Sequence, residues 1–255
     1  MSMTTKTIFI TGATAGFGTA IARLFAQLGW QLILLGRRQE RLDALAKELG
    51  ETTKVHTLAI DVCDANALQA GVENLPAEFK NIDVLVNNAG LGLGLAPAYE
   101  GNLDHWHIMV ETNINGLLNC THAILPGMVA RNKGHIVNIG SIAGTQPYPG
   151  GNVYGATKAF VLQFSQNLNA DLVKTAVRVT NIEPGAAKTE FSLVRYSGDQ
   201  ERADAVYHGM QALTGEDIAN NVHWVVSQPA HVTISRIEIV PTHQSFAGFN
   251  MHREE

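Results

Sequence analysis

Cysteine is scarce in this sequence: among 255 residues, only Cys63 and Cys120 are cysteines. They form no CxxC pair and fit no metal-ligand spacing, so both are expected to be buried thiols in a reducing compartment. HExxH motifs and carboxylate-rich loops are also missing. His105 and His107 lie two positions apart, and side chains with that spacing diverge on a helix. The sequence therefore predicts no metal site.

Charge and long apolar runs are scarce as well. Charged residues make up 16% of the chain, and the formal net charge is −5 at pH 7, so no basic surface for nucleic acid or for an anionic membrane is expected. No apolar run approaches the roughly 18–20 residues of a transmembrane helix. The N-terminus also lacks the long apolar segment of a signal peptide. These absences predict a soluble, cytoplasmic protein with neither a nucleic-acid nor a membrane partner.

Strand-like runs recur at fairly regular intervals along a chain that is 45% hydrophobic. Most are apolar and β-branched without strict alternation, which is typical of strands covered on both faces in a parallel sheet. Helical patterns lie between them. We predict a single α/β domain over residues 1–255, a doubly wound Rossmann fold with a central parallel sheet of about seven strands flanked by helices. The predicted strands cover residues 7–11, 31–36, 55–60, 82–87, 135–140, 177–182 and 234–240.

Two later segments have distinct patterns. Residues 152–173 predict a long helix with a stripe of Phe160, Phe164 and Leu168 at helical spacing. This stripe packs either in the core against the sheet or, on a second face, against another subunit. Residues 184–213 match no core element, so we expect a loop or substrate lid over the carboxyl ends of the strands, where ligands bind in such folds.

A glycine-rich turn, TGATAGFG (11–18), follows the first predicted strand. Gly12, Gly16 and Gly18 permit a tight turn and a close approach of the backbone to a pyrophosphate, whose charge is favoured by free N–H groups and the helix dipole. The spacing GxxxGxG differs from the common GxGxxG, and a glycine turn without a ligand is the alternative. Its position between a strand and an amphipathic helix favours dinucleotide binding.

The ends of the next strands bear on the choice of cofactor. NAD sites usually place an acidic residue after the second strand, whereas this chain has Arg37 and Arg38 there. Guanidinium groups bind phosphate in a bidentate manner, so the pair predicts NADP(H). Alternatively, the two arginines only solvate the start of the second helix. Asp61-Val62 is expected near the adenine, and NNAG (87–90) allows close backbone approach at Gly90.

A serine, a tyrosine and a lysine lie where the fifth strand and the following helix reach the same edge. Ser141 follows the strand, and Tyr154 and Lys158 open the helix, with Cβ atoms about 5–6 Å apart on one face. A free tyrosine has a pKa of about 10, and a nearby cation lowers it by about 1–3 units. Tyr154 is expected to exchange a proton with an alcohol or carbonyl while Ser141 hydrogen-bonds the substrate oxygen. Ordinary helix packing is the alternative explanation.

Over roughly residues 6–250, the sequence resembles the short-chain dehydrogenase/reductase family. The resemblance is carried by TGATAGFG, Asp61-Val62, NNAG, TNINGL, Ser141, YGATK and IEPG. It implies a catalytic tetrad of Asn113, Ser141, Tyr154 and Lys158, in which the asparagine stabilises a helix bulge and a water in a proton relay. The predicted cofactor-binding residues are Gly12, Thr14, Ala15, Gly16, Phe17, Gly18, Arg37, Arg38, Asp61, Val62, Asn88, Ala89, Gly90, Tyr154, Lys158, Pro184, Gly185 and Thr189.

A narrower resemblance points to the NADP-dependent 3-hydroxy acid dehydrogenases. It is carried by GRRQERL, GHIVNIGSIAG, GGNVYGATKAFV, AVRVTNIEPG, TEFSLVR and PAHV. It implies oxidation of serine, allo-threonine or 3-hydroxypropionate-type acids, or reduction of the matching semialdehydes. Ala15 stands where many NADP-using relatives carry a basic residue, so phosphate selectivity would depend on Arg37 and Arg38.

A hydroxy-acid substrate requires a cation for its carboxylate. Lys188 and Arg195 both lie in the predicted lid, and the fork geometry of a guanidinium favours Arg195; a solvated lid charge is the alternative. Ser141, Tyr154 and Arg195 are therefore the predicted substrate-binding residues.

Two other functions stay open at this point. One is reduction of another carbonyl, such as a ketoacyl thioester or a ketone, and the other is a regulator that senses NADP(H) without turnover. The family resemblance also implies a homotetramer.

Overall fold

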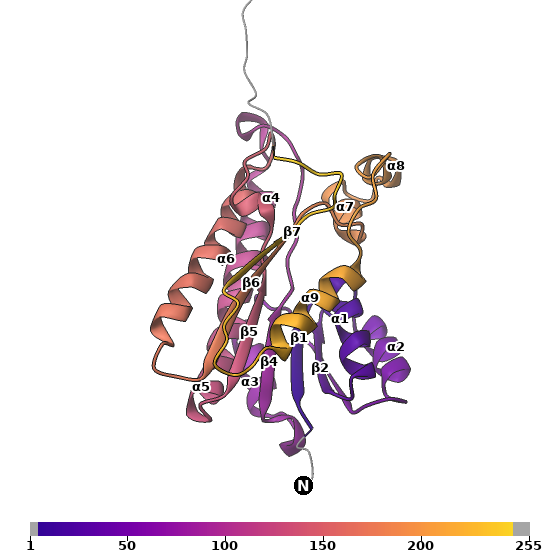
Figure 1. Cartoon of the computed structure of the whole chain (residues 1–255). Coiled ribbons are helices and arrows are strands. Elements are labelled where there is room, and N and C mark those ends of the chain that lie inside the picture. The colour runs from indigo at the N-terminus through magenta and orange to yellow at the C-terminus, as the bar shows by residue number, and fades with distance from the viewer. Residues whose placement is uncertain (1–4, 247–255) are drawn as a thin grey trace, which may run out of the picture.

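The computed structural model describes residues 5–246 and contains a seven-stranded parallel sheet in the order β3-β2-β1-β4-β5-β6-β7 (Figure 1). This order confirms the predicted doubly wound Rossmann fold. The predicted domain limits of 1 and 255 lie outside the described residues. The strands are β1 (Thr7–Thr11), β2 (Gln31–Gly36), β3 (Val55–Ala59), β4 (Ile82–Asn87), β5 (Gly134–Ile139), β6 (Val177–Pro184) and β7 (Arg236–Ile239).

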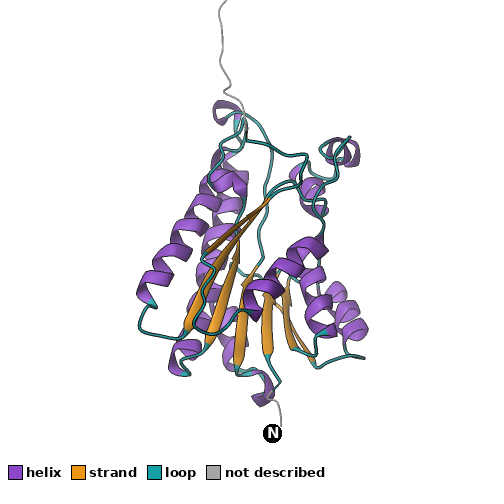
Figure 2. Cartoon of the chain, in the orientation of Figure 1, coloured by secondary structure: helices purple, strands orange, loops and turns teal. Residues whose placement is uncertain are grey.

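Helices cover both faces of the sheet because successive strand residues point to opposite sides (Figure 2). Ile8 and Ile10 of β1 belong to one core cluster, which also contains residues of α1, α2 and α9. Phe9, between them, belongs to the opposite cluster with residues of α3, α5 and α6. The helices on the first face are α1 (Gly16–Gln27), α2 (Gln39–Leu49) and α9 (Gly215–Ser227), and those on the second are α3 (Ala65–Glu73), α5 (Gly116–Ala130) and α6 (Asn152–Asp171).

The shorter elements lie in the connections. A π-helical turn, η3, joins α4 to α5 in one nearly continuous helix. The remaining elements are η1 (Ala77–Phe79), η2 (Ala98–Glu100), α4 (Leu103–Val110), η3 (Glu111–Asn115), η4 (Ile142–Gly144), α7 (Glu190–Arg195) and α8 (Gln200–Ala205).

The segment 184–213 is more ordered than a loop. β6 continues to Pro184, two residues beyond the predicted end of this strand, and α7 and α8 follow. Thr189 and Asp199 begin these two helices, since their side chains accept hydrogen bonds from the backbone N–H groups of Phe191 and Arg202. Figure 1 shows α7 and α8 standing beyond one end of the sheet.

The apolar stripe of α6 divides between two environments. Leu168 is buried in the core, whereas Phe160 and Phe164 are half-buried and stack on each other with ring centroids 5.8 Å apart. The helix ends at Asp171, two residues before the predicted end. The stripe therefore supplies core contacts through Leu168 and, in part, Phe164, and leaves both aromatic rings partly exposed.

Two further features concern chemistry and location. Both cysteines are free, but only Cys120 is buried, while Cys63 is partly exposed. Within residues 5–246, no group of three or more His, Cys, Asp or Glu side chains is arranged to hold a metal ion. None of the helices in this part of the chain combines the length and the apolar character that a membrane crossing requires.

Candidate active site

A cavity of about 740 Å³ opens at the carboxyl edge of the sheet. The chain order reverses between β1 and β4, and ligands of doubly wound sheets bind in the crevice at this point. Every predicted site residue lines the cavity except Gly18 and Asn113, which lie directly behind its wall. The structure thus brings together side chains from segments that lie far apart in the sequence.

The glycine turn has the shape that a pyrophosphate requires. Gly12 and Gly16 have φ angles of 63° and 51°, in the left-handed region that favours glycine. A Cβ on Gly18 would lie 2.8 Å from the Asn88 side chain, so this glycine allows close packing of α1. Ala15 begins α1 without a side-chain cap. The first N–H groups of the helix therefore face the cavity as a ready anion site.

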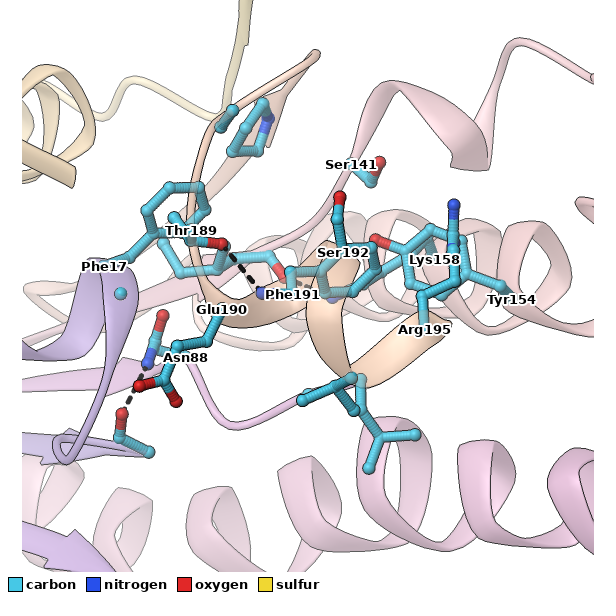
Figure 3. A pocket seen from close by; sticks show the side chains of 18 of the residues that line it. Phe17, Asn88, Ser141, Tyr154, Lys158, Thr189, Glu190, Phe191, Ser192 and Arg195 are labelled. Carbon is cyan, nitrogen blue, oxygen red and sulfur yellow. Dashed lines mark hydrogen bonds between the residues drawn. The ribbon is translucent and has the colours of Figure 1, made fainter. Parts of the chain in front are cut away.

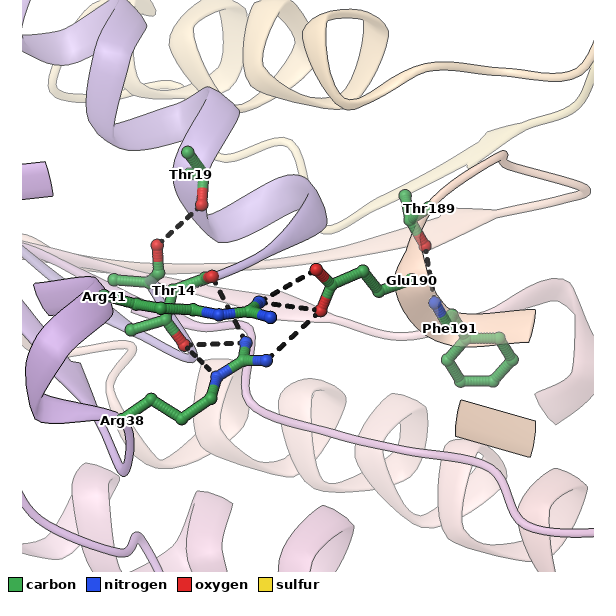
Figure 4. Close-up of polar contacts among 8 residues, drawn as sticks. Thr14, Thr19, Arg38, Arg41, Thr189, Glu190 and Phe191 are labelled. Carbon is green, nitrogen blue, oxygen red and sulfur yellow. Dashed lines mark hydrogen bonds and ion pairs between the residues drawn. The ribbon is translucent and has the colours of Figure 1, made fainter. Parts of the chain in front are cut away.

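Two arginines, Arg37 and Arg38, follow β2 and lie beside this glycine turn. The Arg38 guanidinium donates hydrogen bonds to the Thr14 hydroxyl at 2.9 Å and 3.2 Å and to the Thr14 carbonyl at 3.2 Å. It also binds Glu190 at 3.3 Å, as Figure 4 shows. Arg37 forms a looser ion pair with Asp61 at 3.6 Å. Arg38 is thus fixed beside the glycine turn, while Arg37 is held weakly.

Ser141, Tyr154 and Lys158 meet at the other end of the cavity (Figure 3). Ser141 follows β5 and begins η4, its hydroxyl accepting a hydrogen bond from the Ala143 N–H at 3.1 Å. The Lys158 ammonium is buried, donates to the Ile139 carbonyl at 2.8 Å, and lies 5.9 Å from the Tyr154 ring centroid. The predicted juxtaposition of the three side chains is therefore present.

The acidity of these groups differs from the sequence-based expectation. Burial raises the pKa of Tyr154 to about 12, although the hydrogen bond with Ser141 and the charge of Arg195 act to lower it. Burial also lowers the pKa of Lys158 to about 8. The expectation that Lys158 holds the phenol's pKa below its ordinary value is wrong for the protein alone, because desolvation of the phenolate is the larger effect.

Asn113 lies in the π-helical turn η3, which is the helix bulge implied by the family resemblance. Its amide donates to the Leu91 carbonyl at 2.8 Å and to the Thr157 hydroxyl at 3.0 Å, and its oxygen accepts from the Leu91 N–H at 2.8 Å. A Cβ on Gly90 would lie 3.3 Å from the Asn113 oxygen and 3.5 Å from the Lys158 ammonium. Asn113 and Lys158 therefore converge on one point of the backbone.

The two candidate cations for a substrate carboxylate differ sharply. The Arg195 guanidinium stacks 4.8 Å from the Tyr154 ring centroid and 4.8 Å from that of Phe191, and it donates to the Tyr148 hydroxyl at 3.2 Å. Its buried Nε meets no hydrogen-bond partner among residues 5–246. Lys188 instead forms an exposed ion pair with Asp204 at 3.5 Å. Of these two cations, Arg195 is therefore the one that faces Tyr154.

Comparison with known proteins gives the family. The short chain dehydrogenase model matches residues 6–199. This chain belongs to the short-chain dehydrogenase family. It is 56% identical over 247 residues to NADP-dependent 3-hydroxy acid dehydrogenase YdfG of Salmonella typhi, covering 96% of this chain and 99% of that protein. It is 53% identical over 248 residues to serine 3-dehydrogenase of Agrobacterium fabrum, covering 97% and 98% of the two chains.

Solved structures of similar proteins agree with this assignment. The closed form of a serine dehydrogenase complexed with NADP⁺ superimposes with a TM-score of 0.94 at 54% identity, covering 97% of this chain and 100% of that one. Serine dehydrogenase from Escherichia coli gives a TM-score of 0.81 at 50% identity, covering 94% and 99%. The fold of this short-chain dehydrogenase is therefore closer to the closed complex than to the second structure.

The cavity of this short-chain dehydrogenase fits NADP(H) on its own geometry. The uncapped start of α1 and the turn at Gly12 and Gly16 match a pyrophosphate. Arg38, oriented by Thr14, offers a guanidinium where a 2′-phosphate would approach. The residues present are therefore suited to this dinucleotide, with Arg38 better fixed for phosphate recognition than Arg37.

Several residues of the site were not among the sequence-based predictions. Arg41, which does not itself line the cavity, lies one helical turn after Arg38 and binds the lining residue Glu190 at 2.8 Å; the i, i+3 spacing of the two arginines was a usable signal. Tyr148 and Phe191 contact Arg195. Nothing in the local sequence indicates these contacts, because each joins segments that only the folded chain brings together.

Proposed function

We propose that this protein is an NADP-dependent oxidoreductase that transfers a hydride between NADP(H) and a small 3-hydroxy acid, such as L-serine, L-allo-threonine or 3-hydroxypropionate, or its semialdehyde. The observation that carries the proposal is Arg195, a partly buried cation stacked on Tyr154, whose buried Nε has no hydrogen-bond partner among residues 5–246. A carboxylate bound there would place the substrate's hydroxyl carbon near the phenol. The names of the similar dehydrogenases support the same substrate class.

The cofactor-binding residues in this proposal are those of the glycine turn, Arg37, Arg38 and the ends of β3, β4 and β6. When bound, NADP⁺ supplies the acceptor for the hydride. Pro184, Gly185 and Thr189 line the cavity on the lid side and Asn88 and Ala89 on the β4 side. Their backbone and side-chain groups hold the two ends of the dinucleotide and exclude water between them.

The reacting proton is handled by the tetrad. Tyr154 accepts the proton of the substrate hydroxyl during oxidation and returns it to the carbonyl oxygen during reduction. The Ser141 hydroxyl hydrogen-bonds the same oxygen as its charge changes. Lys158 supplies a positive charge one turn from the phenol and would bind the ribose of the cofactor, and Asn113, in the π-helical turn, would hold a water that connects to Lys158.

The proposal also includes a substrate lid, a cellular location and an oligomeric state. Residues 184–213 act as a substrate lid on a single domain, supported by the residues of α7 that line the cavity, among them Glu190, Phe191 and Arg195 (Figure 3). The protein is proposed to be cytoplasmic and homotetrameric. The exposed apolar side chains Tyr99 near α4 and Leu103 and Ile108 on α4 support burial of this region in an assembly.

One assay tests the function directly. The protein is mixed with NADP⁺ and a panel of 3-hydroxy acids, 2-hydroxy acids and neutral alcohols, and reduced nicotinamide is followed by absorbance. Turnover restricted to 3-hydroxy acids is expected. Turnover only of thioesters or ketones with NADPH would favour a different carbonyl reductase. Tight NADPH binding with no turnover on either panel would favour a sensor.

A further inference from the structure

Glu190 connects the lid to the arginines after β2. It is the first residue of α7, and its carboxylate accepts hydrogen bonds from Arg41 at 2.8 Å and 3.1 Å and from Arg38 at 3.3 Å. Figure 4 shows both guanidinium groups reaching this one carboxylate. The side chains of Arg38, Arg41 and Glu190 are 44%, 48% and 44% exposed, so the cluster is open to an incoming phosphate.

Two other residues of α7, Phe191 and Arg195, face Tyr154. The Phe191 ring lies 5.4 Å from the Tyr154 ring, and Arg195 ends the helix stacked on the same tyrosine. Thr189, which caps the helix, would lie 3.2 Å from a Cβ on Gly16. A single helix of six residues therefore touches the cofactor-phosphate end, the glycine turn and the catalytic tyrosine.

The charge of Glu190 acts on the arginines in two ways. Although partial burial alone raises its pKa, the hydrogen bonds from Arg41 and Arg38 lower it overall, so the carboxylate is ionised at neutral pH. It attracts both guanidinium groups and anchors α7. It also weakens the net attraction between Arg38 and a 2′-phosphate, because the carboxylate and the phosphate would be two anions beside one cation and would repel each other.

We propose that Glu190 is a positioning residue that ties the lid helix α7 to the arginines of the 2′-phosphate site. The same positive charge then attracts both the carboxylate of the lid and the phosphate of the cofactor. This inference depends on the proposed function for the identity of the substrate end. Through α7, the anchor keeps Arg195 and Phe191 against Tyr154. Because of this carboxylate, the affinity for the phosphate is lower than the two arginines alone would give.

Substitution of Glu190 by glutamine tests the proposal, because it keeps the shape and removes the charge. Two effects of opposite sign are expected at low ionic strength. Binding of the adenosine-end fragment 2′,5′-ADP tightens about threefold or more because repulsion is removed. With 3-hydroxypropionate as substrate, KM rises about threefold or more because α7 is held less firmly. Calorimetry measures the first effect and initial rates measure the second.

Two comparisons separate this role from a general loss of structure. Glu201→Gln removes the same charge from an exposed residue of α8 and is expected to change neither value. Hydrogen exchange of residues 190–195 with NADPH bound is expected to increase equally in Glu190→Gln, in Arg41→Met and in the double variant. Equal increases identify the Arg41–Glu190 pair as the anchor.

The outcomes distinguish this inference from the proposed function. If Glu190→Gln weakens the binding of 2′,5′-ADP and of the hydroxy acid together, or leaves both unchanged, the inference is overturned. Additive exchange effects of the two single variants also overturn it. If the native protein turns over no hydroxy acid, the proposed function fails, while 2′,5′-ADP binding and hydrogen exchange still decide the role of Glu190.

Discussion

At the scale of single residues, the acidity of Tyr154 depends on a balance that the sequence does not reveal. The YxxxK spacing places a cation near the phenol, but burial raises the tyrosine's pKa to about 12 and lowers that of Lys158 to about 8. Arg195, stacked at 4.8 Å, adds a second positive charge that favours the phenolate. We therefore expect proton transfer near neutrality to depend on Arg195 as well as on Lys158.

The pH dependence of turnover follows from this balance. Oxidation requires the ionised phenol, so its kcat/KM rises with pH up to the pKa of Tyr154, whereas reduction requires the neutral phenol and declines above it. Because the Lys158 ammonium, with a pKa of about 8, is charged only below that pH, Lys158→Met is expected to lower the oxidation kcat/KM about tenfold or more at pH 7 and much less above pH 9. Initial rates across a pH series measure the difference. An equal loss at all pH values would show that the charge of Lys158 has no influence on the phenol.

Arg195 gives a prediction about substrate choice. Replacing it with methionine leaves a bound carboxylate without its partner, so the kcat/KM measured with 3-hydroxypropionate is expected to fall about a hundredfold or more. The methyl ester of the same acid should lose much less. Lys188→Met is the matched control, because Lys188 pairs with Asp204 at the surface. Equal losses on acid and ester would remove the assigned role of Arg195.

Cofactor choice is the third prediction at this scale. Neutral replacements of Arg37 and Arg38 are expected to weaken NADPH binding about a hundredfold, with little change for NADH. Since Thr14 fixes Arg38 by three hydrogen bonds, Arg38→Leu alone should account for most of the loss. Fluorescence titration with both nucleotides gives the ratio. If NADPH and NADH binding weaken alike, phosphate recognition lies elsewhere.

The residues that could be predicted from sequence are those whose role is set by neighbouring positions within one turn or one helix. Gly12 and Gly16 are needed for left-handed backbone in one turn, and Tyr154 and Lys158 are set by one helix. The Arg41–Glu190 pair joins residues 149 positions apart, and its formation depends on where the lid lies. No local pattern encodes that proximity, so the pair could not be predicted.

At the scale of elements, buried strands were easier to predict than lid helices. The strands of a parallel sheet are continuous apolar runs, and each predicted strand is present with its ends within two residues of the predicted ones. The helices α7 and α8 have six residues each. Such short helices show too few turns for a periodic pattern, although Thr189 and Asp199 are recognisable caps.

At the scale of the whole molecule, strand direction explains the site. All seven strands within residues 5–246 are parallel, so the glycine turn after β1, NNAG after β4 and Ser141 after β5 reach the same edge. The shared edge could therefore be inferred once alternation of strands with helices was recognised. The position of α7 could not, because it depends on side-chain contacts made only across the finished cavity.

Assembly is the prediction that belongs to this scale. The aromatic pair Phe160–Phe164 on α6 and the exposed Leu103 and Ile108 on α4 are expected to be buried between subunits. Light scattering after size-exclusion chromatography should give about four times the 27.5 kDa mass of one chain. Ile108→Glu is expected to reduce that mass. A monomer for the native protein would contradict the proposed tetramer.

The most direct test of the central claim is hydride transfer in Tyr154→Phe. The variant keeps the ring that Phe191 and Arg195 contact and loses only the hydroxyl. In a single turnover with NADP⁺ and a 3-hydroxy acid, the rate is expected to fall about a thousandfold, with NADPH affinity changed little. A rate near that of the native protein, in a variant with unchanged circular dichroism, would contradict the assignment of Tyr154 as the proton-transfer group.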